Sequence, residues 1–154
     1  LKNEIEMATS ADMCGKKYPL NLLDIEVDDQ SFFGKWIPSL SPFNQLRVDF
    51  QQRKFYIPSM YRGKIFVYDL YTLEFISSFD AHVGVRNVLI DKNNPNHIFS
   101  WNYPTGEVIE HQLPEGNILR SWKLGPILRT LNWDCNQQDL LATTAVGGFR
   151  IHLN

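Results

Sequence analysis

The chain has 154 residues, a formal net charge of −2 at pH 7 and no block of Lys and Arg, so its composition argues against a nucleic-acid partner. No apolar run approaches the roughly 18 residues that a membrane-spanning helix needs, and we expect a soluble chain without a membrane span in this segment. The hydrophobic fraction of 44% and the aromatic fraction of 13% are typical of a packed, strand-rich domain. Composition leaves the cellular compartment open.

Residues 1–20 carry no sustained helical or strand pattern, and we expect them to form a tether or a cap over the strands that follow. Cys14 lies in this segment, whereas Cys135 lies near the other end of the chain. Their separation matches no metal-binding or redox motif. Two free thiols and a disulfide between them both remain open, and the disulfide would imply an oxidising compartment.

From residue 21 onward, short alternations of apolar and polar residues, separated by turn residues, predict β-strands. Residues 45–80 hold four such strands, and residues 85–123 repeat them in the same order. The flanking units are shorter, with two strands predicted in 21–37 and three in 127–154. The sequence therefore predicts a series of related β-units over residues 21–154.

Matching positions in these units recur 43 residues apart. The spacing is kept by the apolar set Leu22, Ile65, Val108 and Ile151, by the aromatic set Trp36, Phe79 and Trp122, and by the pairs Gly63 with Gly106 and Asp91 with Asp134. A strand-rich repeat of about 40–45 residues is typical of a β-propeller blade. We predict an all-β propeller of four-stranded antiparallel blades, of which this chain holds about three to three and a half.

The predicted ring is incomplete, because propellers usually close with about four to eight blades. Two explanations are open: the chain is part of a longer polypeptide, or a second copy of the chain completes the ring. Without one of these, the last strand of the three-stranded partial blade at 127–154 would expose unpaired backbone groups.

An arginine stands at the start of the predicted first strand of three units, at Arg47, Arg86 and Arg129. Because the first strand of a blade lines the central channel, we expect these side chains to surround one end of that channel. A ring of guanidinium groups would bind a carboxylate, a phosphate or an acidic peptide. The alternative is that each arginine pairs with a neighbouring carboxylate or caps a carbonyl group in its own loop.

No metal, cofactor or catalytic residue is predicted. Oxygen donors occur on the same strands, at Asp49, Asn87, Asp91, Asn132 and Asp134. They could coordinate a hard cation, but Asp91 and Asp134 stand beside turns, where such side chains usually bind the local backbone. We also expect structural roles for the four histidines, because His82, His97, His111 and His152 share no metal-binding spacing and belong to no nucleophile motif.

Residues 63–70, followed by 79–82 and 85–90, resemble a WD-repeat unit. Tyr68 and Asp69 stand where that family has its Trp-Asp pair, and His82 stands where its Gly-His histidine falls. The aspartate that completes the family's hydrogen-bonded tetrad would fall near Thr105, so the tetrad is broken in this chain. Residues 56–69 also resemble the repeats of surface-layer and lactonase-like propellers.

The two resemblances imply different functions. A WD-like propeller implies a non-enzymatic scaffold that binds a protein or an acidic peptide through its faces or channel mouth. A lactonase-like propeller implies a hydrolase or small-molecule binder with a site in the channel. Because the channel positions offer arginine more than carboxylate, we favour the scaffold and its partner-binding role.

Overall fold

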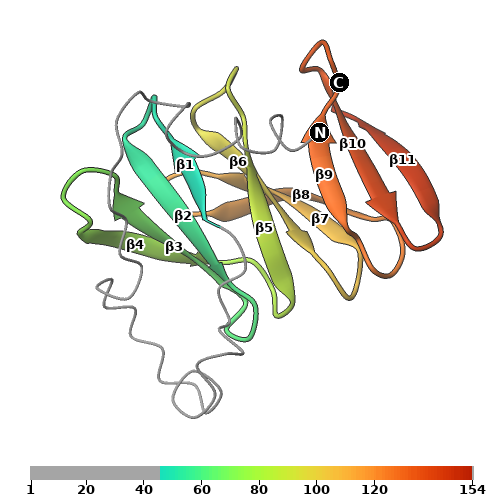
Figure 1. Cartoon of the computed structure of the whole chain (residues 1–154), viewed down its shortest axis with the longest axis horizontal. Helices are drawn as coiled ribbons and strands as arrows, with labels where there is room; N and C mark the ends of the chain where they lie inside the picture. Colours follow the sequence, from blue (N-terminus) through green and yellow to red (C-terminus); the bar gives the residue numbers. More distant parts are fainter. Residues whose placement is uncertain (1–45, 154) are drawn as a thin grey trace, which may run out of the picture.

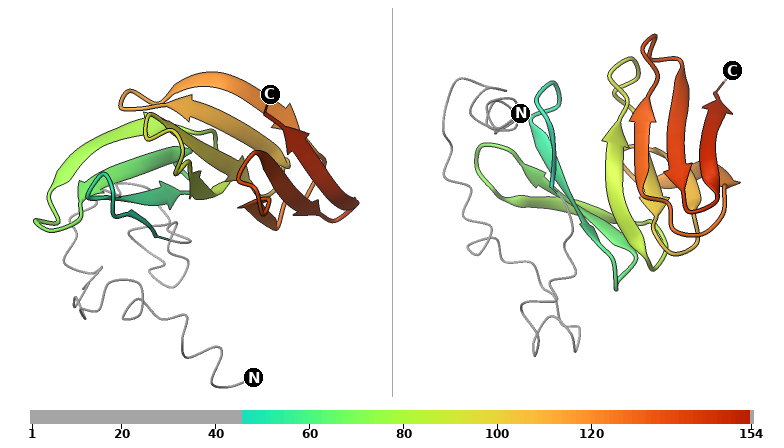
Figure 2. Two further views of the ribbon diagram at one scale, coloured as in Figure 1. Left: turned by 90° about the horizontal axis from the view of Figure 1, so that it is seen from above. Right: turned by 45° about the vertical axis from the view of Figure 1, so that its right-hand side comes forward.

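The computed structural model describes residues 46–153 and contains eleven β-strands and no helix over that range. The predicted cap at 1–20 and the predicted half blade at 21–37 lie outside the described residues. None of the described residues forms a helix that is long and apolar enough to cross a membrane. The strands form three separate antiparallel sheets, arranged as a fan (Figures 1 and 2).

The first two sheets have four strands each and the third has three. Blade 1 has the order β1 (Arg47–Asp49), β2 (Lys54–Ser59), β3 (Lys64–Asp69) and β4 (Phe75–Asp80). Blade 2 has the order β5 (Val85–Ile90), β6 (His97–Asn102), β7 (Glu107–Gln112) and β8 (Asn117–Lys123). Blade 3 consists of β9 (Thr130–Trp133), β10 (Asp139–Thr144) and β11 (Gly147–His152), with β10 in the middle.

Strand alternation gives each blade two apolar faces, and neighbouring blades bury them against each other. The interface between blades 1 and 2, here called interface 1/2, contains Tyr56, Ile65, Val67, Phe79, Val85, Val88 and Ile98. The interface between blades 2 and 3, here called interface 2/3, contains Phe99, Trp101, Val108, Leu131, Leu140, Ala142 and Ile151. Burying each large apolar side chain contributes about 1.5–3 kcal/mol, so these two interfaces hold the sheets together.

The recurrence of glycine at positions 63 and 106 has a steric cause. Both residues have positive φ, at 63° and 68°, which a residue with a side chain adopts only at a cost. A Cβ atom at Gly106 would lie 1.5 Å from the carbonyl oxygen of Gly125, and one at Gly63 would lie 2.5 Å from the backbone of His82. In blades 1 and 2, the loop after the second strand therefore needs glycine where the loop to the next blade crosses it.

The 43-residue spacing marks equivalent positions for Ile65 and Val108 but not for Ile151. Ile65 and Val108 are each the second residue of a third strand, paired with Pro58 and Trp101. Ile151 is the fifth residue of β11 and pairs with Leu140. The reason is the turn between β10 and β11, which spans only residues 145–146, whereas the corresponding loops span 60–63 and 103–106. The shorter turn moves Ile151 to the face that contacts blade 2.

Candidate partner-binding face

The loops at one end of the three blades form a continuous surface. They comprise residues 60–63, 81–84, 103–106, 124–129 and 145–146, and together with Arg86 we call them the arginine face. Backbone hydrogen bonds join them in series: Gly84 N donates to Met60 O, Tyr103 N to Gly84 O, Leu128 N to Tyr103 O and Ala145 N to Pro126 O. This series of bonds holds the loops of neighbouring blades in fixed relative positions.

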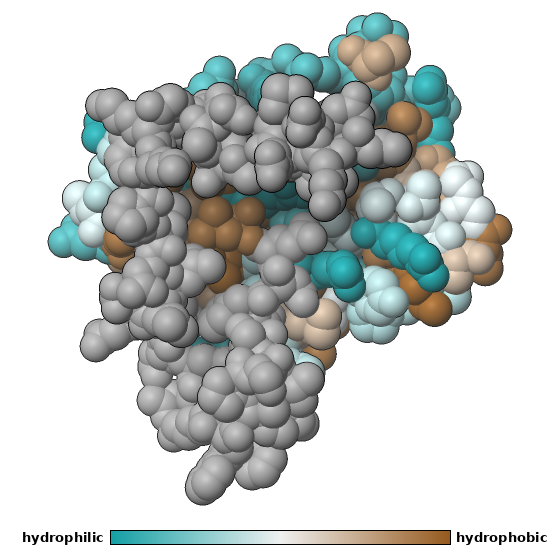
Figure 3. All heavy atoms as spheres, viewed as in Figure 1, coloured by the Kyte–Doolittle hydropathy of each residue, from teal (hydrophilic) through white to brown (hydrophobic). Residues whose placement is uncertain are grey.

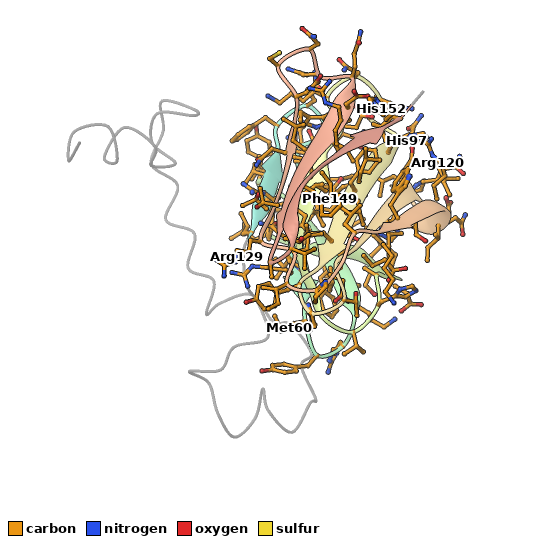
Figure 4. All side chains as sticks on the ribbon, turned by 90° about the vertical axis from the view of Figure 1, so that its right-hand side faces the viewer. Met60, His97, Arg120, Arg129, Phe149 and His152 are labelled. Carbon is orange, nitrogen blue, oxygen red and sulfur yellow. The ribbon has the colours of Figure 1, made fainter. Side chains whose placement is uncertain are left out.

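Arg86 and Arg129 occupy equivalent positions on the arginine face. The residue after Arg86 is Asn87, which pairs with Trp101, the fifth residue of β6. The residue after Arg129 is Thr130, which pairs with Thr143, the fifth residue of β10. The Arg86 guanidinium lies 4.6 Å from the centre of the Tyr103 ring, a cation–π contact that holds its direction. Arg129 is exposed, and Figure 4 shows it toward the same end of the blades as Met60.

Arg47 lies at a different level. Arg47 pairs with Tyr56, the third residue of β2. In blade 2 the corresponding position is Leu89, which pairs with Phe99, the third residue of β6. Arg47 is therefore three residues farther along its strand than Arg86, although it is also exposed. The structure brings Arg86 and Arg129 to one end of the blades and does not add Arg47 to them.

The arginine face contains no Asp or Glu. The two carboxylates that flank its loops already have partners, since Asp80 lies 3.0 Å from Lys64 Nζ and Glu107 lies 2.9 Å from His82 Nδ1. Within residues 46–153, neither Arg86 nor Arg129 forms an ion pair. Their guanidinium groups therefore keep their charge available to a ligand.

Apolar and aromatic side chains accompany the arginines on this face. Tyr61 is 39% exposed, and Val83 and Val146 are each 67% exposed. Exposed apolar groups beside charged ones are a common composition for a protein-binding surface.

The opposite ends of the blades carry three of the oxygen donors that the sequence offered, Asp49, Asp91 and Asp134, of which the last two were predicted to bind their own turns. Asp49 Oδ1 accepts from Gln52 N, Asp91 Oδ1 accepts from Asn93 N and Asn94 N, and Asp134 Oδ1 accepts from Gln138 N and Asp139 N. Hydrogen bonds from backbone amides, above all from Gln138, lower the pKa of Asp134. The turn role predicted for Asp91 and Asp134 is confirmed, and residues 46–153 contain no cluster of His, Cys, Asp and Glu able to hold a metal.

Two of the histidines occupy sites that the sequence did not predict. His111 is fully buried in interface 1/2, where its ring lies 5.1 Å from that of Phe79. Its Nδ1–H donates to Gly116 O, so Nε2 accepts the hydroxyl proton of Ser100 at 2.8 Å. Burial is the main cause that lowers the pKa of His111. At the other interface, His97 Nδ1 lies 2.9 Å from Glu110, a residue only 3% exposed.

Glu110 also accepts from Arg120 Nε at 2.6 Å. The three side chains come from β6, β7 and β8, and we call them the ion cluster. Sequence reasoning missed it because the separations of 13 and 10 residues match no motif and become contacts only in the antiparallel register. The repeat carried one signal: residues 43 earlier are Lys54, Val67 and Ser77, so a carboxylate replaces an apolar residue at a buried position.

Other sequence expectations can be placed directly. Of the spaced aromatic set, Phe79 is buried against blade 2 and Trp122 packs on interface 2/3, whereas Trp36 lies outside the described residues. Asp69 accepts from Tyr71 N and Thr72 N in its own turn, which lowers its pKa. Cys135 is exposed and free, and Cys14 lies outside the described residues.

Comparison with known proteins identifies the fold. The chain is similar to the β-propeller domain of Cps50 (Swd1) from Myceliophteria thermophila, with a TM-score of 0.61 and 14% sequence identity over 73% of this chain and 36% of that domain. No family model and no curated protein matches the sequence. The chain thus spans about a third of the matched domain's length.

The described residues are therefore blades of a β-propeller, in a ring that they do not close. The fold class predicted from the sequence is confirmed. An identity of 14% shows the fold alone and leaves the partner to be argued from the surface residues.

Proposed function

We propose that this propeller is a non-enzymatic, WD-like scaffold that binds an acidic segment of a partner protein on the arginine face. The observation that supports this most directly is the pairing of Arg86 and Arg129 at equivalent positions in a set of loops without Asp or Glu. Arg86 and Arg129 each present a guanidinium group that can bind a carboxylate through two parallel hydrogen bonds.

The remaining features of the face fit a peptide better than a small anion. Val83 and Val146 expose two-thirds of their surface, and Tyr61 is also exposed, so a bound segment can bury apolar side chains next to its carboxylates. Arg86 is pre-oriented by Tyr103, which reduces the side-chain entropy lost on binding. The alternative lactonase-like site has less support, because Asp49, Asp91 and Asp134 are engaged in their own turns.

A charge-reversal experiment tests the proposal. The probe is a fluorescein-labelled peptide of alternating Glu and Leu, with the corresponding Lys and Leu peptide as its opposite, and binding is followed by fluorescence anisotropy. We expect the double variant Arg86→Glu, Arg129→Glu to bind the acidic peptide about tenfold more weakly or worse, because two favourable charge contacts become repulsive. Added salt should weaken binding of the acidic peptide to the unmodified protein.

The matched control is Lys92→Glu, which reverses an exposed charge at the opposite end of the blades. It should leave the affinity within about twofold. Arg129→Glu alone is also measured, in case the loss of the contact between Arg86 and Tyr103 unfolds the double variant. Because Arg129 is exposed, this single variant should fold normally. Equal affinity of the double variant and the unmodified protein, or an equal loss in Lys92→Glu, contradicts the proposal.

A further inference from the structure

A pocket of about 320 Å³ opens between blades 2 and 3, at the end opposite the arginine face. Blade 2 lines it with the ion cluster, Phe99 and Asn93, and blade 3 with Trp133, Gln137 and Gln138. Figure 4 shows His97, Arg120 and His152 gathered toward this end, away from Met60 and Arg129. The pocket is thus separate from the proposed partner-binding face.

Hydrogen bonds between the blades fix the pocket walls. Asn93 Nδ2 donates to Gln137 O at 3.1 Å on one side, and Arg120 Nη1 donates to Leu153 O at 2.9 Å on the other. Trp133 Nε1 donates to Ile90 O at 2.9 Å, which sets the orientation of the indole ring. The pocket is therefore formed before any ligand enters, as most small-molecule sites are.

The charged groups in the pocket already have hydrogen-bonding partners. Glu110 is bound by both Arg120 and His97. Arg120 donates one hydrogen bond to Glu110 and another to Leu153 O. The remaining carboxylate, Asp91, is 9% exposed and accepts two backbone N–H groups. Each charged group of the pocket therefore already has hydrogen-bonding partners, which favours a neutral ligand over a strongly anionic or cationic one.

The other groups that line the pocket are uncharged, and they include both hydrogen-bonding amides and aromatic rings. The side-chain amides of Gln137 and Gln138 each offer a donor and an acceptor, which suits hydroxyl groups that also donate and accept. Trp133 lies beside them, and its contact with Phe99 is edge-on at 5.5 Å, so the two rings form an apolar wall. A ring with C–H groups on its face and hydroxyl groups on its edge matches both halves of this lining.

We propose that this pocket binds a small neutral polyol of monosaccharide size. The apolar face of the ligand would contact Trp133, and its hydroxyl groups would bond to Gln137, Gln138 and the partly exposed His97. A pocket of this size with few hydrogen-bonding groups favours weak affinity, with a dissociation constant on the order of 1 mM.

Saturation-transfer NMR on the full chain tests this proposal with glucose, galactose and N-acetylglucosamine as neutral probes. Glucuronate and glucosamine serve as their anionic and cationic counterparts. We expect transfer to at least one neutral sugar, and a loss of affinity of about fivefold in Gln138→Met and in Trp133→Phe. Gln51→Met, the same change at an exposed position outside the pocket, should bind like the unmodified protein.

Gln138 is exposed and uses its backbone N–H, not its side chain, to bind Asp134, so Gln138→Met should fold normally. Absence of transfer to every neutral sugar overturns the proposal. So does equal binding by Gln138→Met and Gln51→Met. Binding of glucuronate or glucosamine about tenfold tighter than glucose would show that charge selects the ligand, which also overturns it.

Discussion

The two interfaces between blades use the same backbone positions for different purposes. In interface 1/2 the paired residues Tyr56 and Val67 are both buried, and they contribute to a continuous apolar cluster. At the equivalent positions of interface 2/3 stand Phe99 and Glu110, and the Glu110 carboxylate is bound by the Arg120 guanidinium and the His97 imidazole. Glu110 and Phe99 therefore line a pocket in one repeat, whereas the equivalent pair of the other repeat lies within an apolar cluster.

The two interfaces also differ in how their polar groups are satisfied. Interface 1/2 buries Tyr56 with its hydroxyl unpartnered among the described residues, and burial together with the nearby Asp49 raises the pKa of that phenol. Glu110 of interface 2/3 uses both carboxylate oxygens. Glu110 is thus satisfied by two side chains at the wall of a pocket, whereas the Tyr56 hydroxyl is enclosed without a partner among residues 46–153.

The outer faces of blades 1 and 3, which no other described blade covers, also differ in how far their residues are buried. On blade 3 the row of Asn132, Leu141 and Arg150 is exposed, and Figure 3 shows hydrophobic and hydrophilic residues interspersed over that blade. On blade 1 the corresponding surface is the buried cluster of Phe55, Ile57, Phe66 and Tyr68. Burial also raises the pKa of Tyr68.

Gly106→Ala should break interface 2/3 and have the largest effect. Its Cβ atom would overlap the carbonyl oxygen of Gly125, and its φ of 68° is unfavourable for alanine. We expect a loss of on the order of 3 kcal/mol or more in the free energy of unfolding, or failure to fold. Circular dichroism during thermal unfolding measures it. Gly148→Ala, whose Cβ atom would lie 4.0 Å from its nearest neighbour, the Ala142 carbonyl oxygen, is the control, and equal losses in the two variants would contradict the steric argument.

Glu110→Val tests the ion cluster by giving blade 2 the residue that blade 1 has. We expect a loss of about 2 kcal/mol in urea unfolding, because His97 and Arg120 lose their common partner. The triple variant His97→Lys, Glu110→Val, Arg120→Ser carries all three blade 1 residues and should recover most of that loss.

Glu107→Val provides the comparison on the same strand. Its partner His82 is half exposed, so the expected loss is below about 1 kcal/mol. If Glu107→Val costs as much as Glu110→Val, the burial of the ion cluster does not explain its effect.

The buried His111 predicts how interface 1/2 responds to acid. Because its folded-state pKa lies below the ordinary value of 6.5, the unfolded chain binds more protons just below that pH. Its contribution to stability is therefore complete above about pH 6.5 and is lost as the pH falls toward the lowered pKa, with a slope of up to about 1.4 kcal/mol per pH unit.

Urea unfolding between pH 7.5 and 5 measures this slope, with the pH values chosen to bracket the ordinary histidine pKa of about 6.5. His111→Gln should flatten the slope. His152→Gln, the same change at an exposed histidine of β11 outside interface 1/2, is the control. An unaltered slope in His111→Gln would mean that other groups cause the acid sensitivity.

The elements of the fold followed from the sequence because their signals are local. Period-2 alternation marked the strands, and Asp91 and Asp134 capped turns within a few residues of themselves. The sequence showed Gly63 and Gly106 as a repeated pair but not why glycine is needed there. The reason is the close approach of the loop to the next blade, at His82 and at Gly125. Ile151 shows the limit, since a turn two residues shorter shifted an apparent match by three positions.

The sequence by itself determined the propeller blades, their order and the arginines near the start of their first strands, because hydrophobic period and turn chemistry act within a few residues. Only the tertiary structure decided that Arg86 and Arg129 share a level that Arg47 does not, since strand register sets that level. It alone placed His97, Glu110 and Arg120 together, because a contact among three strands depends on how they pair and on which blade packs against them.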